Sequence, residues 1–229
     1  MVEKFDNLLN TLGLKLSQEQ NQQFEIYYTL LLEWNKKVNL TSIVDKEDVY
    51  SKHFFDSLTL LKAVKFDNQS ILDVGSGAGF PSIPLKIVFP ELNIKIVDSL
   101  KKRIDFLEHL AKKLNIRIEL IHGRIENQTE FDHFDIVTAR AVASLPILCE
   151  LCLPFVKVNG YFLAMKSSKA DTELTQSIKV IEILNSKYVE TIKFKLEAEQ
   201  RAIIKVIKED LNPQGYPRKY NQIKNKPIV

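Results

Sequence analysis

The chain has 229 residues, of which 45% are hydrophobic and 27% are charged, and its formal net charge is +3. These values are ordinary for a soluble globular protein, and no apolar run reaches the roughly 18 residues that a membrane helix needs. The N-terminal sequence MVEKFDNLLN carries acids and amides where a signal peptide is first basic and then apolar. We therefore expect a cytoplasmic protein without a membrane segment.

The first part of the chain, residues 1–64, has the apolar spacing of amphipathic helices. A helix is predicted to begin at Ser17, because Gln20 three residues later is typical of a capping box. One face of this helix carries four apolar residues at intervals of three and four: Phe24, Tyr27, Tyr28 and Leu31. A polar break, VNLTS, separates it from a further helix predicted over residues 45–64.

From about residue 65, short apolar runs of strand type alternate with helices. The predicted strands are SILDV, NIKIVDS, IRIELIHG, FDIVTAR and GYFLAMK, with helices over residues 81–88 and 100–114 and around residues 147–152. Two final runs, YVETIKFKLE and QRAIIKVIKE, have no helix between them and predict an antiparallel hairpin. The pattern predicts an α/β, Rossmann-like fold with a mostly parallel sheet and helices on both faces. It also divides the chain into a helical segment, 1–64, and a sheet domain, 65–229.

The chain has two cysteines, Cys149 and Cys152, with the spacing of a redox or metal motif. They lie in an apolar helix, and no second Cys or His pair accompanies them. We therefore expect two buried structural thiols and no metal site.

Three glycines follow the first predicted strand in the sequence ILDVGSGAGFPSIPL. Gly75, Gly77 and Gly79 stand at the carboxyl end of a parallel strand, where ligands bind in open α/β sheets. Glycine permits positive φ and lets a ligand lie against the main chain, so we expect a ligand here rather than an ordinary turn. Phe80 stands where a dinucleotide motif has its third glycine, which favours a nucleoside ligand without phosphate.

Asp98 ends the second predicted strand, close to the distance of about 20 residues at which an acid meets ribose hydroxyls in Rossmann-like folds. Capping of the next helix is the alternative role for this carboxylate. Together, the residues LDVGSGAG and the later VD resemble the S-adenosylmethionine site of class I methyltransferases.

A longer series of motifs resembles one family of that class. Over residues 34–219, in matching order, stand EWNKKVNLTS, KHFFDSL, DVGSGAGFPSIPLKI, DSLKKRIDFL, GRIE, FDIVTARAVASL, LAMKS and YPRK. They resemble the bacterial small-subunit ribosomal RNA guanine-N7 methyltransferases, also called RsmG or glucose-inhibited division protein B (GidB). The resemblance implies S-adenosylmethionine as the cofactor and a guanine in the 530 loop of 16S rRNA as the substrate.

The resemblance also implies roles for individual residues. It places six residues in the cofactor site, with Asp98 at the ribose and Ile125 and Glu126 at the adenine: Gly75, Phe80, Asp98, Ile125, Glu126 and Arg140. Gly77 and Gly79 belong to the same glycine loop. The tail YPRKYNQIKNKP keeps the opening of the family's ending but has less proline and glycine than is usual there.

Guanine N7 carries a lone pair and can attack a sulfonium methyl group without losing a proton. We therefore expect no general base, and catalysis by positioning the reactants and excluding water. Arg140 and Lys166, which end the fourth and fifth strands, are the candidates for positioning the substrate, although surface solvation is their alternative role. Phe80 could stack on a base or serve packing.

Candidate contacts to the RNA come from three parts of the chain. Residues 211–229 contain basic side chains and no acids, so this tail either contacts phosphates or is a solvated end. The candidates are Asn39, Thr41, His53 and Asp56 in the helical segment, Lys101, Lys102 and Arg103 after Asp98, and Arg218 and Lys219 in the tail.

The leading interpretation is an enzyme, an rRNA guanine-N7 methyltransferase, with 16S rRNA or the small ribosomal subunit as its partner and a monomeric state. One alternative is a class I methyltransferase that acts on another nucleic acid or on a small molecule. Another is a non-catalytic RNA-binding assembly factor that retains the nucleoside pocket. A third is an NAD-binding oxidoreductase, which Phe80 disfavours.

Overall fold

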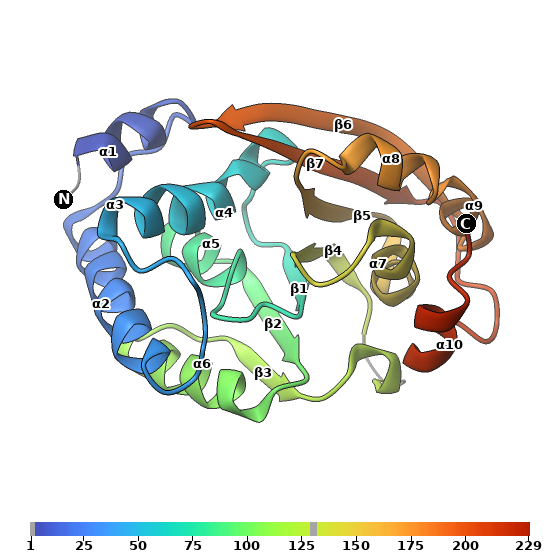
Figure 1. Cartoon of the computed structure of the whole chain (residues 1–229), viewed down its shortest axis with the longest axis horizontal. Coiled ribbons are helices and arrows are strands. Elements are labelled where there is room, and N and C mark those ends of the chain that lie inside the picture. The colour runs from blue at the N-terminus through green and yellow to red at the C-terminus, as the bar shows by residue number, and fades with distance from the viewer. Residues whose placement is uncertain (1–2, 129–131) are drawn as a thin grey trace.

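The centre of the fold is a seven-stranded sheet with the strand order β3-β2-β1-β4-β5-β7-β6 (Figure 1). The computed structural model describes residues 3–128 and 132–229. Strands β1 to β5 run parallel, whereas β7 is antiparallel to both β5 and β6. The predicted mixed sheet with a C-terminal hairpin is thus confirmed. The strands are β1 (Ser70–Val74), β2 (Asn93–Asp98), β3 (Glu119–His122), β4 (Phe134–Arg140), β5 (Val156–Lys166), β6 (Ser186–Leu196) and β7 (Glu199–Lys208).

Successive residues of the central strands point into two apolar cores, one on each face of the sheet. In β1, Ile71 belongs to one core and Leu72 to the other, and both side chains are fully buried. The first core is completed by α1 (Glu3–Asn10), α2 (Gln18–Asn35), α5 (Ser82–Val88) and α6 (Lys101–Leu114). The second is completed by α7 (Leu145–Cys152), α8 (Ala170–Thr175), α9 (Ile178–Ile183) and α10 (Tyr220–Asn225). Figure 1 shows α2 and α6 well separated from α7 and α10, with strands of the sheet between the two groups.

The N-terminal helices pack directly on the sheet and its glycine turn. The predicted capping box is present at the start of α2, where Ser17 and Gln20 each bond the other's backbone N–H. Tyr27 of this helix is fully buried and donates its hydroxyl proton to the carbonyl of Ala78 at 2.5 Å. Residues 1–64 therefore share a core with the sheet. The division of the chain into a helical segment, 1–64, and a sheet domain, 65–229, stays a prediction.

The helix predicted over residues 45–64 has four parts of different pitch. It runs as α3 (Lys46–Val49), the π-helix η1 (Tyr50–Phe55), α4 (Asp56–Leu58) and the 3-10 helix η2 (Thr59–Lys62). π-Helical segments are rare in proteins, and those that occur are often found at functional sites. The π-helix η1 is called the π-turn below. Its position matters here because two candidate substrate residues, His53 and Asp56, lie in it and directly after it.

Several short elements were not predicted from the sequence. These are α8, α9, α10 and the 3-10 helices η3 (Ile125–Asn127) and η4 (Leu153–Phe155). Each has six residues or fewer, too short to show a clear helical period. Both cysteines are buried and free, as expected. Within residues 3–128 and 132–229, no helix has the length and apolar character needed to cross a membrane.

The basic tail folds back onto the sheet domain. Ile223 of α10 is fully buried in the second core. Arg218 forms a two-pronged ion pair with Glu150 of α7, with Nε–Oε1 and Nη2–Oε2 distances of 2.6 Å. The carboxylate of Glu150 is fully buried. Arg218 is thus committed to an internal ion pair, which gives this arginine a structural explanation rather than a phosphate contact. Lys219 beside it is exposed.

Replacement of Arg218 by alanine is expected to destabilise the protein by about 3–5 kcal/mol, because it leaves the buried charge of Glu150 without its partner. Urea unfolding measures this change. Lys219→Ala is the matched control and should stay within about 0.5 kcal/mol of the parent. A loss below about 1 kcal/mol for Arg218→Ala would show that the ion pair does not hold the tail.

Candidate functional site

The glycine turn after β1 uses positive φ at all three glycines, with values of +74° at Gly75, +62° at Gly77 and +99° at Gly79. The space around them differs. A Cβ at Gly79 would lie 2.6–2.9 Å from Ile83, Leu107 and Tyr27, so packing explains that glycine. A Cβ at Gly75 would meet Val142 at 2.8 Å, whereas nothing lies within 4 Å of one at Gly77. Open space for a ligand is therefore found at Gly77.

Asp98 connects the end of β2 to this turn. Its Oδ2 accepts a hydrogen bond from the Gly77 N–H at 3.1 Å, and its Oδ1 accepts one from the Leu100 N–H at 2.9 Å. Arg103 lies 3.4 Å from Oδ2. The carboxylate thus holds the turn and the start of α6 together, and Oδ1, with a single donor, has a second lone pair for another.

Unsatisfied polar groups gather at the same turn. Neither carboxylate oxygen of Asp73 has a partner in good hydrogen-bond geometry among the described residues, and the Ser76 hydroxyl has no partner there either. Asp73 is fully buried, and this burial raises the pKa of its carboxyl to about 7, although the hydroxyl and N–H of Ser82 lie close enough to lower it in part. Because a buried polar group without a partner costs about 1–3 kcal/mol, these atoms fit a site completed by a polar ligand.

The other residues assigned to the cofactor by resemblance lie in η3, after β3. Ile125 is buried, and the Glu126 side chain is only 5% exposed. The N–H of Gly123 donates to the carbonyl of Asp98 at 3.0 Å, which joins this segment to the end of β2. The structure therefore brings the adenine and ribose candidates to one edge of the sheet.

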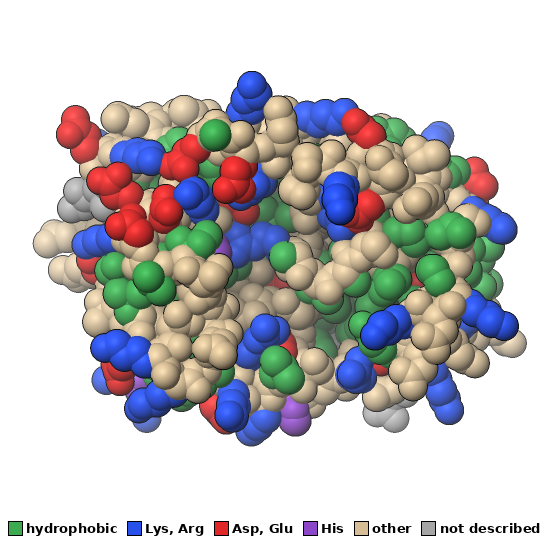
Figure 2. Space-filling view, viewed as in Figure 1, with side chains coloured by type: hydrophobic (Ala, Val, Ile, Leu, Met, Phe, Trp, Pro, Cys, Tyr) green, Lys and Arg blue, Asp and Glu red, His purple; other side chains and the backbone are tan. Residues whose placement is uncertain are grey.

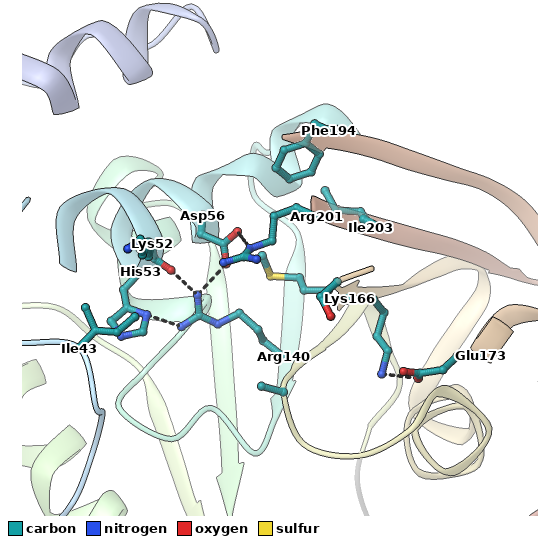
Figure 3. A pocket seen from close by; sticks show the side chains of 14 residues that line it. Ile43, Lys52, His53, Asp56, Arg140, Lys166, Glu173, Phe194, Arg201 and Ile203 are labelled. Carbon is teal, nitrogen blue, oxygen red and sulfur yellow. Dashed lines mark hydrogen bonds and ion pairs between the residues drawn. The ribbon is translucent and has the colours of Figure 1, made fainter. Parts of the chain in front are cut away.

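Arg140, the last residue of β4, connects the sheet to the helical segment (Figure 3). Its Nη1 lies 2.9 Å from Oδ2 of Asp56 and 3.4 Å from the carbonyl of Lys52. Its Nη2 lies 3.3 Å from Nδ1 of His53, and the guanidinium carbon lies 4.7 Å from the centre of the Phe80 ring. Arg140 therefore occupies a fixed position between the glycine turn and the π-turn.

Phe80 is part of the aromatic packing and is only 4% exposed. The His53 ring stacks on it at 4.6 Å between centroids and the Tyr27 ring at 5.5 Å. With these rings and Arg140 around it, Phe80 has no open face for a base. Of its two possible roles, the structure supports packing.

The His53 ring is neutral in this arrangement and has a hydrogen-bond partner at each of its two nitrogens. Arg140 can only donate, so Nδ1 of His53 must accept, and the proton must lie on Nε2. Nε2 lies 2.8 Å from the hydroxyl oxygen of Thr41, which also accepts the Ile43 N–H at 3.0 Å. Burial first, and then the charge of Arg140, lower the pKa of His53 to about 3.

Lys166, the last residue of β5, points away from Arg140 in Figure 3. Its ammonium group lies 2.6 Å from Glu173 and donates to the carbonyl of Ala143 at 2.9 Å. Glu173 also accepts the N–H of Leu145 at 2.6 Å. Lys166 thus fixes the segment after β4, and its ammonium group is not free to hold a phosphate in this conformation.

A pocket of about 340 Å³ opens at the carboxyl ends of β4 and β5. Figure 2 shows a hollow near the centre of this face, with Lys and Arg side chains inside it. The pocket is lined by more basic than acidic side chains: Lys52, Arg140, Lys166 and Arg201 against Asp56 and Glu173.

Four residues of the pocket wall come from the C-terminal hairpin and were missed from the sequence: Phe194, Arg201, Ala202 and Ile203. Arg201 donates from Nε to Oδ1 of Asp56 at 3.2 Å. The alternation of residues along a strand shows which face is buried, but it does not show that this hairpin contacts the N-terminal helical segment. Other expected RNA contacts lie on the surface outside the pocket: Asn39, Lys101 and Lys102.

The sheet order and the glycine turn define a class I S-adenosylmethionine-dependent methyltransferase fold. A methyltransferase from Pyrococcus furiosus is similar with a TM-score of 0.59 and 14% identity, over 83% of this chain and 99% of that one. TYW2 from M. jannaschii in complex with AdoMet is similar with a TM-score of 0.58 and 13% identity, over 73% and 79% of the two chains.

The sequence comparisons define the family within this class. Residues 20–204 match the family model GidB, rRNA small subunit methyltransferase G. The protein named ribosomal RNA small subunit methyltransferase G from Oceanobacillus iheyensis is 50% identical over 99% of this chain and 98% of its own. That from Bacillus cytotoxicus is 49% identical over 95% of both. The chain belongs to the rRNA small subunit methyltransferase G family, which confirms a methyltransferase with S-adenosylmethionine as cofactor and sets aside the oxidoreductase alternative.

The low pKa of His53 predicts a pH-dependent part of the protein's stability. The folded protein keeps this ring neutral, whereas the unfolded chain takes up a proton below about pH 6.5. Its contribution is therefore present above pH 6.5 and is lost as the pH falls from 6.5 towards 3. Between pH 7 and pH 5 the parent should lose about 2 kcal/mol more of its unfolding free energy than His53→Gln does.

Urea unfolding of both proteins at several pH values measures this difference. His122→Gln is the control, because His122 is exposed on β3 and away from Arg140. The unfolding free energy of His122→Gln should change with pH in the same way as that of the parent protein. Parallel curves for the parent and His53→Gln would mean that the ring is not held neutral in the folded state.

Proposed function

We propose that this enzyme transfers the methyl group of S-adenosylmethionine to N7 of a guanine in the 530 loop of 16S rRNA. The names of the relatives support ribosomal RNA of the small subunit as the substrate. The motifs from EWNKKVNLTS to YPRK support the guanine N7 position. On this proposal the protein works in the cytoplasm as a monomer, on 16S rRNA or the small ribosomal subunit.

The observation that carries the choice of N7 is the pairing of the titratable groups around the pocket. Both ring nitrogens of His53 have partners. Asp56 lies between two arginines, and Glu173 is held by Lys166 and the Leu145 N–H. Each imidazole and carboxylate among the described pocket residues is thus held by at least one protein partner, an arrangement that fits a reaction without a general base. Methylation at N7 needs no such base, whereas methylation at a hydroxyl or amino group does.

The residues near the glycine turn fit the cofactor. Gly77 gives open space against the main chain, and Asp98 offers the second lone pair of its Oδ1 to a ribose hydroxyl. Ile125 and Glu126 lie where the adenine would be bound, and the buried Asp73 carboxylate suits the ammonium group of the amino-acid end. The cofactor supplies an activated methyl group for direct transfer to a nucleophile.

Arg140 and its neighbours provide rigid positioning rather than proton transfer. The guanidinium is fixed by Asp56 and His53 and lies over the Phe80 ring, next to the cofactor turn. Aligning two reactants in this way can supply a large share of a rate enhancement, because their motion is restricted before reaction. Arg140 is thus a candidate to position the base or its phosphate, and Lys166 acts through the segment it holds.

Asp98→Ala is expected to weaken S-adenosylmethionine binding by roughly 5- to 150-fold, the effect of losing about 1–3 kcal/mol of charge-assisted hydrogen bonding. Isothermal titration calorimetry measures the affinity directly. Asp105→Ala is the control, because this acid lies in α6 near Asp98 but pairs with Lys101. Equal affinities for the parent and a folded Asp98→Ala protein would remove Asp98 from the cofactor site.

The reaction itself is tested in small ribosomal subunits from cells that lack the gene. Incubation with the purified protein and S-adenosylmethionine should produce one 7-methylguanosine in the 530 loop, located by mass spectrometry of nuclease fragments. A methyl group on another base would favour the alternative of a different nucleic-acid substrate. Cofactor binding with no methyl transfer would favour a non-catalytic assembly factor.

A further inference from the structure

Phe194 is an aromatic side chain in the pocket wall that the reaction described above does not use. It lies in β6, is half-buried and lines the pocket beside Arg201. The two residues are directly paired across the hairpin, so their side chains lie on the same face of the sheet. In Figure 3 the ring of Phe194 stands close to Arg201 and Ile203.

The hairpin that carries Phe194 is fixed to the rest of the site. Arg201 bonds to Asp56, which also binds Arg140. At the hairpin turn, Glu197 accepts a hydrogen bond from the Ser51 hydroxyl at 3.2 Å and forms an ion pair with Lys4. These contacts hold Phe194 in a defined position relative to Arg140.

The Phe194 ring has one face already in use. The ammonium group of Lys62 lies 5.6 Å from the ring centre. A base would therefore stack on the opposite face of the ring. Phe80 is enclosed by Tyr27, His53 and Arg140. Among the described phenylalanine, tyrosine and tryptophan residues, Phe194 is the one that lines this pocket.

The composition of the pocket wall suits a nucleotide. Ile43, Met165 and Ile203 add apolar surface beside Phe194, while the basic side chains outnumber the acidic ones. Apolar or aromatic surface accepts the face of a base, and positive charge accepts its phosphate. A volume of about 340 Å³ is sufficient for a purine base.

The location of the pocket explains why a base would leave its stack. Gly77 and Asp98 do not line the pocket, whereas Arg140 borders it and also lies on Phe80 beside the glycine turn. The Arg140 side chain is only 14% exposed, so the meeting point of the two sites is recessed. A base within a stacked RNA strand cannot reach such a position, and enzymes that act on bases often extrude the nucleotide.

We propose that the target guanine is extruded from the RNA into this pocket and that Phe194 is the aromatic surface on which it stacks. This inference rests on the proposed function and adds a binding residue to it. Loss of the ring should weaken the productive complex, because stacking of one base on an aromatic side chain contributes about 1–3 kcal/mol. Cofactor binding should not change, since Phe194 lies away from Gly77 and Asp98.

The test compares Phe194→Ala, Phe194→Leu and Phe194→Tyr with the parent, using small ribosomal subunits from cells that lack the gene. We expect kcat/KM for methyl transfer to fall roughly 5- to 150-fold for alanine and leucine and to stay within about threefold for tyrosine. Affinity for S-adenosylmethionine, measured by calorimetry, should be the same for all four proteins. Leucine keeps the apolar packing, so its failure to restore activity separates stacking from simple filling of space.

Ile192→Ala is the matched control. Ile192 lies two residues earlier in β6, is also half-buried and packs on the same core, but it does not line the pocket. Its kcat/KM should remain near that of the parent. Full activity of Phe194→Leu, or an equal loss in Ile192→Ala, would overturn the stacking role while leaving the proposed function intact. Absence of 7-methylguanosine with the parent protein would instead overturn the proposed function and this inference with it.

Discussion

The site depends on one buried carboxylate, that of Asp56, which lies between two arginines. Its side chain is 5% exposed, and its two oxygens accept from Arg140 at 2.9 Å and from Arg201 at 3.2 Å. A charge this deeply buried is tolerated only with close partners. The three residues come from the helical segment, from β4 and from the C-terminal hairpin, so one interaction brings together three distant parts of the chain. The pocket walls exist because these parts meet.

The two halves of the site differ in how far their polar groups are satisfied. Around the pocket, Asp56, His53 and Glu173 all have partners in the protein. At the glycine turn, Asp73 and Ser76 are buried without partners in good hydrogen-bond geometry among the described residues. Satisfied networks rigidify a structure, whereas unsatisfied groups carry a desolvation cost that a ligand can relieve. The pocket is thus organised to hold a substrate in a fixed position, and the glycine turn is organised to bind a polar ligand.

The alternation of strands and helices and the C-terminal hairpin could be predicted from the sequence, because short apolar runs and amphipathic helices have distinct patterns, and the glycine spacing marked the end of β1. Local patterns marked Asp98 and Arg140 at strand ends, and the resemblance to the family marked His53 and Asp56, which contact Arg140. Phe194 and Arg201 could not be found in this way, because their role depends on a hairpin that closes against residues more than a hundred positions earlier. Gly79 shows the converse. Its spacing suggested a ligand, but Ile83 and Leu107 leave no room for a side chain at this position.

The contacts of position 140 also explain why arginine suits it better than lysine. The planar fork of Arg140 uses Nη1 for Asp56 and the Lys52 carbonyl and Nη2 for His53. Its guanidinium carbon lies over the Phe80 ring at the same time. Lysine has a compact ammonium group and no planar face, so it could not satisfy these separated acceptors while covering the ring. Because His53 and Asp56 are three residues apart on helical turns, they face the same side of the helical segment, and the fork matches that spacing. The residue that links the cofactor turn to the pocket is therefore fixed by geometry as well as by charge.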